Sequence, residues 1–280
     1  MLDFFPELVL ENIFIYLDKR DLFHLMTLNK KILGSSERIF WASTCLRKRR
    51  DYEVLKDNLD HVYRFIKRLH IPTGSRFHNI NQLLKFSRQL RGLSELDLRD
   101  MHLPKNYFHI ITLRCPYLKI VNLSRTDVTD NCLSLIARNC RKIRKLELFD
   151  CNIITDHGIR QFENTGLTHL SVSSQKITCA ICQSLPLNLV YLHSERLGKV
   201  RPCFLLNMPA TLKEVKFTST FVCSIGIQNI LLVCKVIEHL QIVQGYEWNP
   251  LGFCRRKSLS KEQIDFYLEN VPSLKCIQQE

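Results

Sequence analysis

The sequence predicts an α/β protein with two parts. Three short helices at the N-terminus precede a curved solenoid, with parallel strands on its concave face and helices on its convex face. Three observations predict this architecture. An apolar triplet recurs at a nearly constant spacing along most of the chain. Apolar residues at helical spacing occupy several of the intervals. The first 45 residues break this period and carry helical patterns of their own.

Each triplet has an apolar first position and an apolar residue three places later, and most copies have a third apolar residue five places after the start. Leu189-Leu192 is a partial copy with Ser194 in the third place, and Leu274-Ile277 starts one more copy. Neighbouring triplets start 22 to 27 residues apart, except for the last step of 37, and the first positions are Ile66, Leu93, Leu118, Ile143, Leu167, Leu189, Leu212, Ile237 and Leu274. The third and fifth residues after the start share one face of a strand, and the fourth and sixth share the other. Because one repeat cannot bury its apolar face alone, neighbouring repeats must stack.

Several of the 12 cysteines are locked to this period. Cys115, Cys140 and Cys234 each stand three residues before a triplet, so we expect small buried packing residues rather than disulfides. Cys179 and Cys182 have CxxC spacing, but no second ligand pair accompanies them. We therefore expect no metal site and no cofactor.

The first 45 residues predict three helices. Pro6 suits a first helical turn, and Leu10, Ile13, Phe14 and Leu17 form an amphipathic stripe. Asp21 can cap a second helix, and Ser36 a third that ends near Trp41. A module this small is not very stable alone. We therefore expect its apolar surface to contact a partner.

This segment resembles an F-box, a resemblance carried by Phe5-Pro6, Glu7, Ile13-Phe14, Tyr16-Leu17, Asp21-Leu22, Leu25 and Trp41. Asn29 and Ile32 depart from the pattern, where cysteine and tryptophan are common. The repeats resemble cysteine-containing leucine-rich repeats, and the combination is similar to the F-box/leucine-rich-repeat family. The expected domains are an F-box over 1–45, a basic linker over 46–62 and a solenoid over 63–280 with a long final repeat over 237–273.

The resemblance implies a non-catalytic substrate receptor of an SCF-type ubiquitin ligase, in the ubiquitin-like (Ubl) conjugation pathway of the cytoplasm, the nucleus or both. The F-box would dock on a Skp adaptor joined to a cullin scaffold, and the repeats would hold a target protein. The expected adaptor-binding residues are Phe5, Pro6, Leu10, Ile13, Phe14, Leu17, Leu22, Leu25 and Trp41. The alternative is an F-box scaffold or targeting module that works outside a ligase.

Target binding is expected on the outward strand face, which such solenoids commonly use. The candidates there are Asp97, Arg99, Asn122, Glu147, Phe149, His193, Glu195, Lys216 and Gln241. The long final repeat adds Tyr246 and Trp248, residue types that interface hot spots prefer. The alternatives are an ordinary solvated strand face, and a loop that covers the last repeat.

The formal net charge is +13, and its pattern predicts two rims. Acids favour the turns after the strands, at Asp100, Asp127, Asp130, Asp150 and Asp156, where Asp130 and Asp156 can also cap helices. Cations cluster before the strands, at Arg64, Lys67, Arg68, Arg91, Lys119, Arg141, Lys142, Arg144, Lys145, Lys213 and Lys235. The basic rim either attracts an acidic or phosphorylated target segment or is simply solvated.

Other functions are less favoured by the sequence. Nucleic-acid binding is motivated by the charge and by Arg47-Lys48-Arg49-Arg50, but no recognised binding motif accompanies that run. The run equally suits a nuclear localisation signal or a solvated linker. Nucleotide-binding, zinc-protease and serine-hydrolase motifs are absent. There is no long apolar run and no signal-peptide pattern, so we expect no membrane partner.

Overall fold

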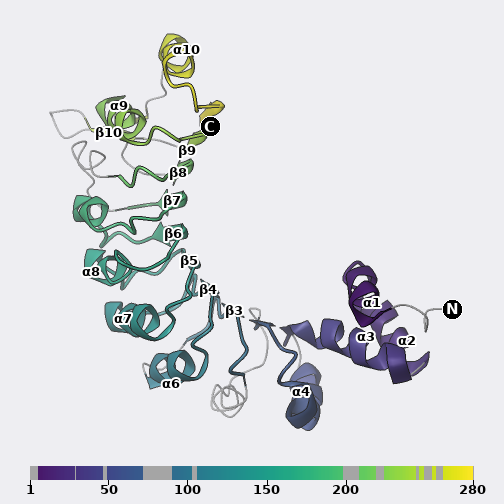
Figure 1. The fold of residues 1–280 in the computed structure, drawn as a ribbon. Coiled ribbons are helices and arrows are strands. Elements are labelled where there is room, and N and C mark those ends of the chain that lie inside the picture. Colours follow the sequence, from purple (N-terminus) through teal and green to yellow (C-terminus); the bar gives the residue numbers. More distant parts are fainter. Residues whose placement is uncertain are drawn as a thin grey trace.

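The computed structural model describes residues 6–28, 30–46, 49–71, 90–102, 106–197, 208–218, 224–243, 246–248, 254–256 and 261–279. Ten strands form one all-parallel sheet in chain order. They are β1 (Ser43–Cys45), β2 (Arg68–His70), β3 (Glu95–Asp97), β4 (Ile120–Asn122), β5 (Lys145–Leu148), β6 (His169–Ser173), β7 (Tyr191–Glu195), β8 (Glu214–Thr218), β9 (His239–Val243) and β12 (Cys276–Gln279). Figure 1 shows the strands stacked along the curve of the solenoid.

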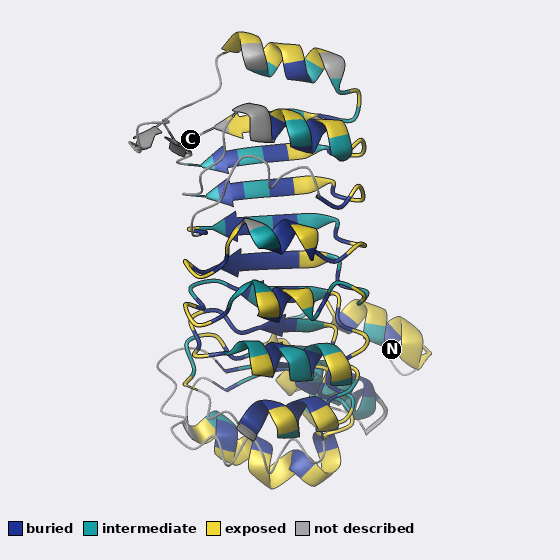
Figure 2. Ribbon diagram, turned by 90° about the vertical axis from the view of Figure 1, so that its left-hand side faces the viewer, coloured by how far each residue is buried: buried dark blue, intermediate teal, exposed yellow. Residues whose placement is uncertain are grey.

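Among the described residues, helices on the outer side of the sheet connect most of the successive strands (Figure 1). They are α4 (Arg49–Val62), α6 (Asn106–Arg114), α7 (Asp130–Asn139), α8 (Asp156–Arg160), the 3-10 helix η2 (Cys179–Gln183), α9 (Ser224–Val233) and α10 (Lys261–Asn270). Buried residues run along the strands and the inner helix faces (Figure 2). None of the helices among the described residues is long and apolar enough to cross a membrane.

The strands pair in the register that the triplets predict. Leu69, Leu96, Val121 and Leu146 lie opposite one another in consecutive strands, and each is at most 4% exposed. The fifth-position residues, such as Leu98 and Leu148, are fully buried. The predicted α/β solenoid with parallel strands is therefore confirmed, because each repeat adds one strand and one layer to a continuous core.

The sheet begins earlier than the triplets suggest. β1 pairs with β2, and Trp41, Thr44 and Leu46 take the three triplet positions one repeat before Ile66. This copy of the triplet cannot be recognised from the sequence, because Thr44 is polar where the other copies have an apolar residue. In the structure the Thr44 hydroxyl is satisfied, since it donates to the carbonyl of Trp41 at 3.0 Å. Residues 49–62, expected as linker, form α4, which buries Leu55 and Leu59 in the same core. The sheet and its core thus extend upstream of the expected start at residue 63.

The N-terminal helices form a module (Figure 1), and this module has its own small core. The helices are α1 (Glu7–Phe14), α2 (Lys19–Leu28) and α3 (Lys30–Ala42), and the core holds Leu10, Phe14, Leu22 and Ile32. Ile32, one of the departures from the F-box pattern, is 5% exposed and still fills this core. Phe40 packs against both this core and the solenoid core. Helix α3 therefore joins the two parts through a packed contact.

The cysteines that recur with the repeat period form hydrogen bonds between neighbouring repeats. The thiols of Cys115, Cys140 and Cys234 donate to the carbonyls of Leu90 (3.5 Å), Cys115 (3.7 Å) and Pro209 (3.4 Å). Burial raises the pKa of each thiol to about 12, so the thiols stay protonated at neutral pH. The prediction of buried packing cysteines is confirmed for these three.

Two aspartates link successive helices instead of capping their own. Asp130, the first residue of α7, accepts from the backbone N–H of Thr155 (2.9 Å) and from its hydroxyl (2.7 Å). Asp156 makes the same contacts with Thr178 in the next repeat. Thr155 in turn caps α8 by accepting from the N–H of His157 at 3.2 Å. Each carboxylate therefore positions the residue that starts the following helix.

Asp130→Ala should lower the free energy of unfolding by about 1–3 kcal/mol, because it leaves two part-buried donors of Thr155 without their acceptor. Denaturant titration followed by circular dichroism measures the change. Asn131→Ala is the control, since Asn131 is an exposed neighbour on the same helix. Equal losses for the two variants would show that the inter-repeat contact contributes nothing.

Candidate functional site

In-register pairing arranges the outward strand residues into rows across the concave face. The central row contains six of the predicted target-binding residues and reads Cys45, His70, Asp97, Asn122, Glu147, Ser171, His193, Lys216, Gln241 and Gln278. Arg99, Phe149 and Glu195 lie two residues later in their own repeats. These nine sequence-predicted residues therefore share one surface, although they span about 145 residues of chain.

A further row precedes the central one by two residues and was missed from the sequence. Its members are Ser43, Arg68, Glu95, Ile120, Lys145, His169, Tyr191, Glu214, His239 and Cys276. The rings of His169 and Tyr191 stack in this row, with centroids 5.8 Å apart. Extending the strand alternation one step toward the N-terminus would have found these residues.

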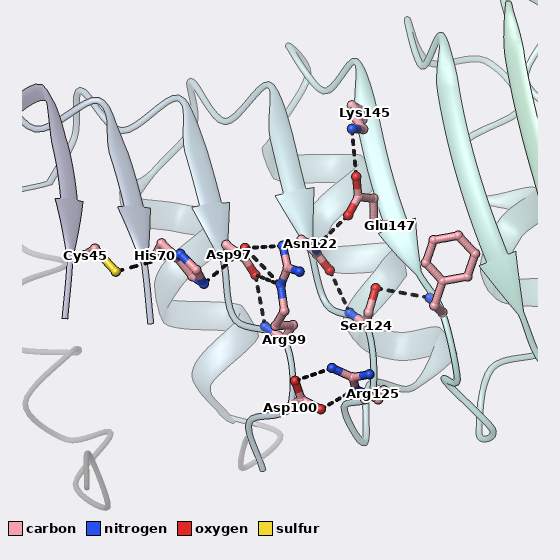
Figure 3. Close-up of polar contacts among 11 residues, drawn as sticks. Cys45, His70, Asp97, Arg99, Asp100, Asn122, Ser124, Arg125, Lys145 and Glu147 are labelled. Carbon is pink, nitrogen blue, oxygen red and sulfur yellow. Dashed lines mark hydrogen bonds and ion pairs between the residues drawn. The ribbon is translucent and has the colours of Figure 1, made fainter. Parts of the chain in front are cut away.

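Asp97 is the centre of a polar network at the β2–β4 end of the concave face (Figure 3). Arg99 pairs with it through Nε, 3.1 Å from both carboxylate oxygens, and through Nη2 at 2.7 Å. His70 Nε2 lies 3.5 Å from the same carboxylate, and Cys45 Sγ lies 3.8 Å from His70 Nδ1. A hollow of about 220 Å³ opens beside this network and is also lined by Arg68 and Glu95.

A second set of polar contacts lies on the next two strands, β4 and β5 (Figure 3). Asn122 donates to Glu147 at 2.6 Å and accepts from the N–H of Ser124 at 3.0 Å. Lys145 pairs with Glu147 at 2.7 Å. Because these side chains hold one another in place, the concave face presents a preorganised pattern of donors and acceptors.

An aromatic contact occupies the middle of the concave face. Phe149 and His193 meet edge to face with ring centroids 4.8 Å apart, and His193 Nε2 lies 3.1 Å from the hydroxyl of Thr218. Burial, and then the neighbouring Lys216, lower the pKa of His193 to about 4. His193 is therefore neutral at pH 7, and Phe149 is a half-buried ring supported from one side.

His193 should make folding pH-dependent. Its pKa in the folded chain, about 4, is below its ordinary value of 6.5, so between these values the unfolded chain binds a proton that the folded chain does not. Stability should fall by about 2 kcal/mol as pH drops from 6.5 to 4, allowing for partial exposure. His193→Gln removes the titrating group. Unfolding curves that keep the same pH slope in both proteins would refute this assignment.

The rim after the strands is not uniformly acidic, which corrects the expectation for that edge. Asp100, Arg125, Asp150 and Arg196 occupy the same position after their strands, all with φ between 46° and 62°. Arg125 pairs with Asp100 at 2.7 Å through Nη2, and Arg196 lies 3.4 Å from Asp150. Arg196 also pairs with Glu195 at 2.9 Å. Asp100 and Asp150 of this rim therefore each lie within ion-pair distance of an arginine from another repeat.

The predicted adaptor-binding residues separate into buried and exposed groups. Leu10, Phe14 and Leu22 fill the module core, and Leu17 and Leu25 pack against it. Trp41 is 9% exposed and belongs to the solenoid core. Pro6 is exposed, as is Ile13 at 44%, while Phe5 lies outside the described residues.

Several exposed apolar side chains on and after α1 were not selected from the sequence. Leu8 is 70% exposed, Ile15 58% and Tyr16 86%, and we call these three together with Ile13 the α1 surface. Phe23 on α2 is 55% exposed. The F-box pattern identifies apolar positions here, but it does not separate those that face the module core from those that face outward.

The long final repeat contains a small antiparallel pair of strands, β10 (Tyr246–Trp248) and β11 (Cys254–Arg256). Tyr246 lies opposite Arg256 and Trp248 opposite Cys254 in the backbone register, while their side chains lie outside what the structure describes. In the CxxC pair, Cys182 is buried with its sulfur 3.3 Å from that of Met208. Within the described ranges, no group of three or more His, Cys, Asp or Glu side chains could hold a metal ion.

No protein-family model and no curated protein matches the sequence. Similar solved structures include internalin C2 from Listeria monocytogenes, at 17% identity and a TM-score of 0.47 over 70% of this chain and 74% of that one. The TLR13–ssRNA13 complex matches at 12% identity and a TM-score of 0.49, over 77% of this chain and 32% of that one. The yeast Rad7–Elc1 complex matches at 13% identity and a TM-score of 0.48, over 97% and 87%. By its own repeat period and strand register, the chain is a leucine-rich-repeat solenoid preceded by a three-helix module.

Proposed function

We propose that this chain is the substrate-recognition subunit of an SCF-type ubiquitin ligase. In this proposal the helical module is an F-box that docks on a Skp adaptor bound to a cullin, and the concave face of the solenoid binds the target protein. The observation that carries it is the α1 surface, an exposed apolar surface on a small module that is firmly joined to a repeat solenoid.

The α1 surface supports docking because a cluster of large exposed apolar side chains marks an interaction site. Helix α1 is fixed against the rest of the module by ion pairs with α3 and by its buried side chains. Arg38 of α3 pairs with Glu7 at 2.6 Å and with Glu11 at 3.2 Å, while Leu10 and Phe14 are buried. Leu8 and Ile13 are thus presented on a fixed helix, and Ile15 and Tyr16 follow directly after its end, which lowers the ordering cost of binding.

The concave face supports target recognition because its side chains are already ordered. The Asp97–Arg99 and Asn122–Glu147 contacts fix a polar pattern, and Phe149 adds an apolar ring between them and Lys216. Helix α3 connects this face to the docking module through packed cores. The chain would therefore accelerate ubiquitin transfer by holding the target near the conjugating enzyme.

Affinity purification of the full chain, followed by depletion in the same cells, tests the proposal. We expect Skp and cullin to co-purify, and at least one protein bound to the solenoid to accumulate on depletion. Skp without cullin, and no accumulating protein, would favour the alternative of a scaffold outside a ligase. Absence of both Skp and cullin would overturn the proposal.

A further inference from the structure

The edge of the solenoid where the strands start contains a second hollow. Its volume is about 610 Å³, and its lining residues are Arg91, Leu113, Arg114, Pro116 and Tyr117. These residues come from the turn before β3, the end of α6 and the turn before β4. In Figure 2 the strands point left, so the turns that precede them form the opposite edge. The hollow therefore shares no residue with the concave rows or with the α1 surface.

Cations surround this hollow, and no acidic side chain among the described residues pairs with them. Arg91 and Arg114 line it, and the ammonium of Lys142, from the next turn, lies 4.6 Å from the ring centroid of Tyr117. Arg141 is the exposed neighbour of Lys142. Within the described part of the chain none of these four cations makes an ion pair, whereas Arg99, Lys145 and Lys213 elsewhere on the solenoid do. Their charge is therefore available to an anionic partner.

Apolar side chains stand among these cations. Leu113 is 55% exposed and Tyr117 is 51% exposed, and both line the hollow. A hollow of this size falls within the range of about 300–1,000 Å³ that is typical of binding sites. Lys142 covers one face of the Tyr117 ring, which prevents a nucleic-acid base from stacking on that face. The combination therefore fits a peptide with carboxylates and an apolar side chain better than it fits nucleic acid.

We propose that this hollow binds an acidic peptide segment of a partner protein. Asp or Glu carboxylates of the segment pair with Arg91, Arg114 and Lys142, and a neighbouring apolar residue of the segment enters the hollow beside Leu113 and Tyr117. This docking surface is independent of adaptor binding. It remains testable whether or not the chain works in a ubiquitin ligase.

The test uses the full chain and three labelled probes in fluorescence anisotropy. The first is a 12-residue peptide rich in Asp and Glu with a central leucine, the second replaces its acids by Gln and Asn, and the third is a single-stranded RNA. We expect the acidic peptide to bind at low salt, and its affinity to fall as the salt concentration rises. Equal binding of the neutral peptide, or preferred and competitive binding of the RNA, would overturn the proposal.

Matched variants locate the site. Arg91→Ala with Lys142→Ala should lower the affinity for the acidic peptide at least tenfold. Lys213→Ala with Lys235→Ala should lower this affinity less than twofold. Lys235 occupies the same position before its strand as Arg91, but it lies several repeats away from the hollow. Equal weakening by the two pairs would overturn the proposal, because it would show diffuse attraction to a basic edge.

A charge-exchanged variant tests the site by a gain of binding, which a misfolded chain could not show. Arg91→Glu with Lys142→Glu should lose the acidic peptide and gain binding to a Lys-rich peptide with the same central leucine. A folded variant is one whose thermal unfolding midpoint matches that of the unchanged chain. If a folded charge-exchanged chain still prefers the acidic peptide, the hollow is not its site.

Discussion

Replacing Ile13 and Tyr16 by aspartate is expected to lower the affinity for a Skp adaptor at least 100-fold. The two side chains are 44% and 86% exposed, so the substitutions should leave the folded module intact. In a complex each new carboxylate would be buried against an apolar partner surface without a counter-ion, and such burial costs several kcal/mol. Isothermal titration calorimetry of the purified chain with the adaptor measures the loss.

The controls separate a damaged surface from a damaged fold. Leu187→Asp with Leu232→Asp places two carboxylates at apolar residues of the solenoid with comparable exposure, 64% and 63%, and should leave adaptor affinity unchanged. Phe14→Ala is a poor test of docking, because Phe14 is 1% exposed and its loss opens a cavity in the module core. A decrease of less than threefold for the Ile13 and Tyr16 variant would show that the α1 surface is not the docking site.

The register of the solenoid could be predicted because every repeat solves the same packing problem. Once Leu96 and Leu98 face the core, Asp97 must face outward, and parallel in-register pairing places Asn122 and Glu147 beside it. The same argument correctly placed Gln241, more than 100 residues later, in that row. Periodic residues are therefore easy to place from sequence, since one correct assignment fixes all of them.

Contacts between non-equivalent residues could not be predicted in this way. Asp130 looks like a cap for its own helix, and only the stacking distance between repeats shows that its carboxylate reaches Thr155. Arg125 and Arg196 pair with Asp100 and Asp150 of the strand-end rim from equivalent positions, which a count of acids in the turns overlooks. These features depend on side-chain reach between repeats, which the spacing of apolar residues does not encode.

In the N-terminal module, the sequence could not predict which apolar residues are buried and which are exposed. The amphipathic stripe combines Leu10 and Phe14, which are buried, with Ile13, which is 44% exposed. On a helix with both a core face and a docking face, apolar residues occupy both. The stripe therefore identifies the helix but not the division between its faces, and the same ambiguity applies to Trp41.

Trp41→Ala is expected to destabilise the chain by about 3–5 kcal/mol while changing adaptor affinity less than twofold. Trp41 is 9% exposed, belongs to the solenoid core and packs edge to face on Phe40 with ring centroids 5.2 Å apart. Its removal leaves a cavity where α3 meets the first repeat. Denaturant unfolding measures the stability, and hydrogen exchange should show that β1 and β2 lose protection before the later strands do.

The two roles considered for Trp41 give opposite results, so one variant distinguishes them. A core residue loses stability and keeps adaptor affinity, whereas a docking residue keeps stability and loses affinity. Phe23→Ala serves as the stability control, because Phe23 is an aromatic residue of the same module that is 55% exposed and should change the free energy of unfolding by less than 1 kcal/mol. Unchanged stability of Trp41→Ala with a tenfold loss of adaptor affinity would return Trp41 to the docking surface. The expected result instead places Trp41 in the core where α3 meets the first repeat, so that its contribution is to the stability of the solenoid.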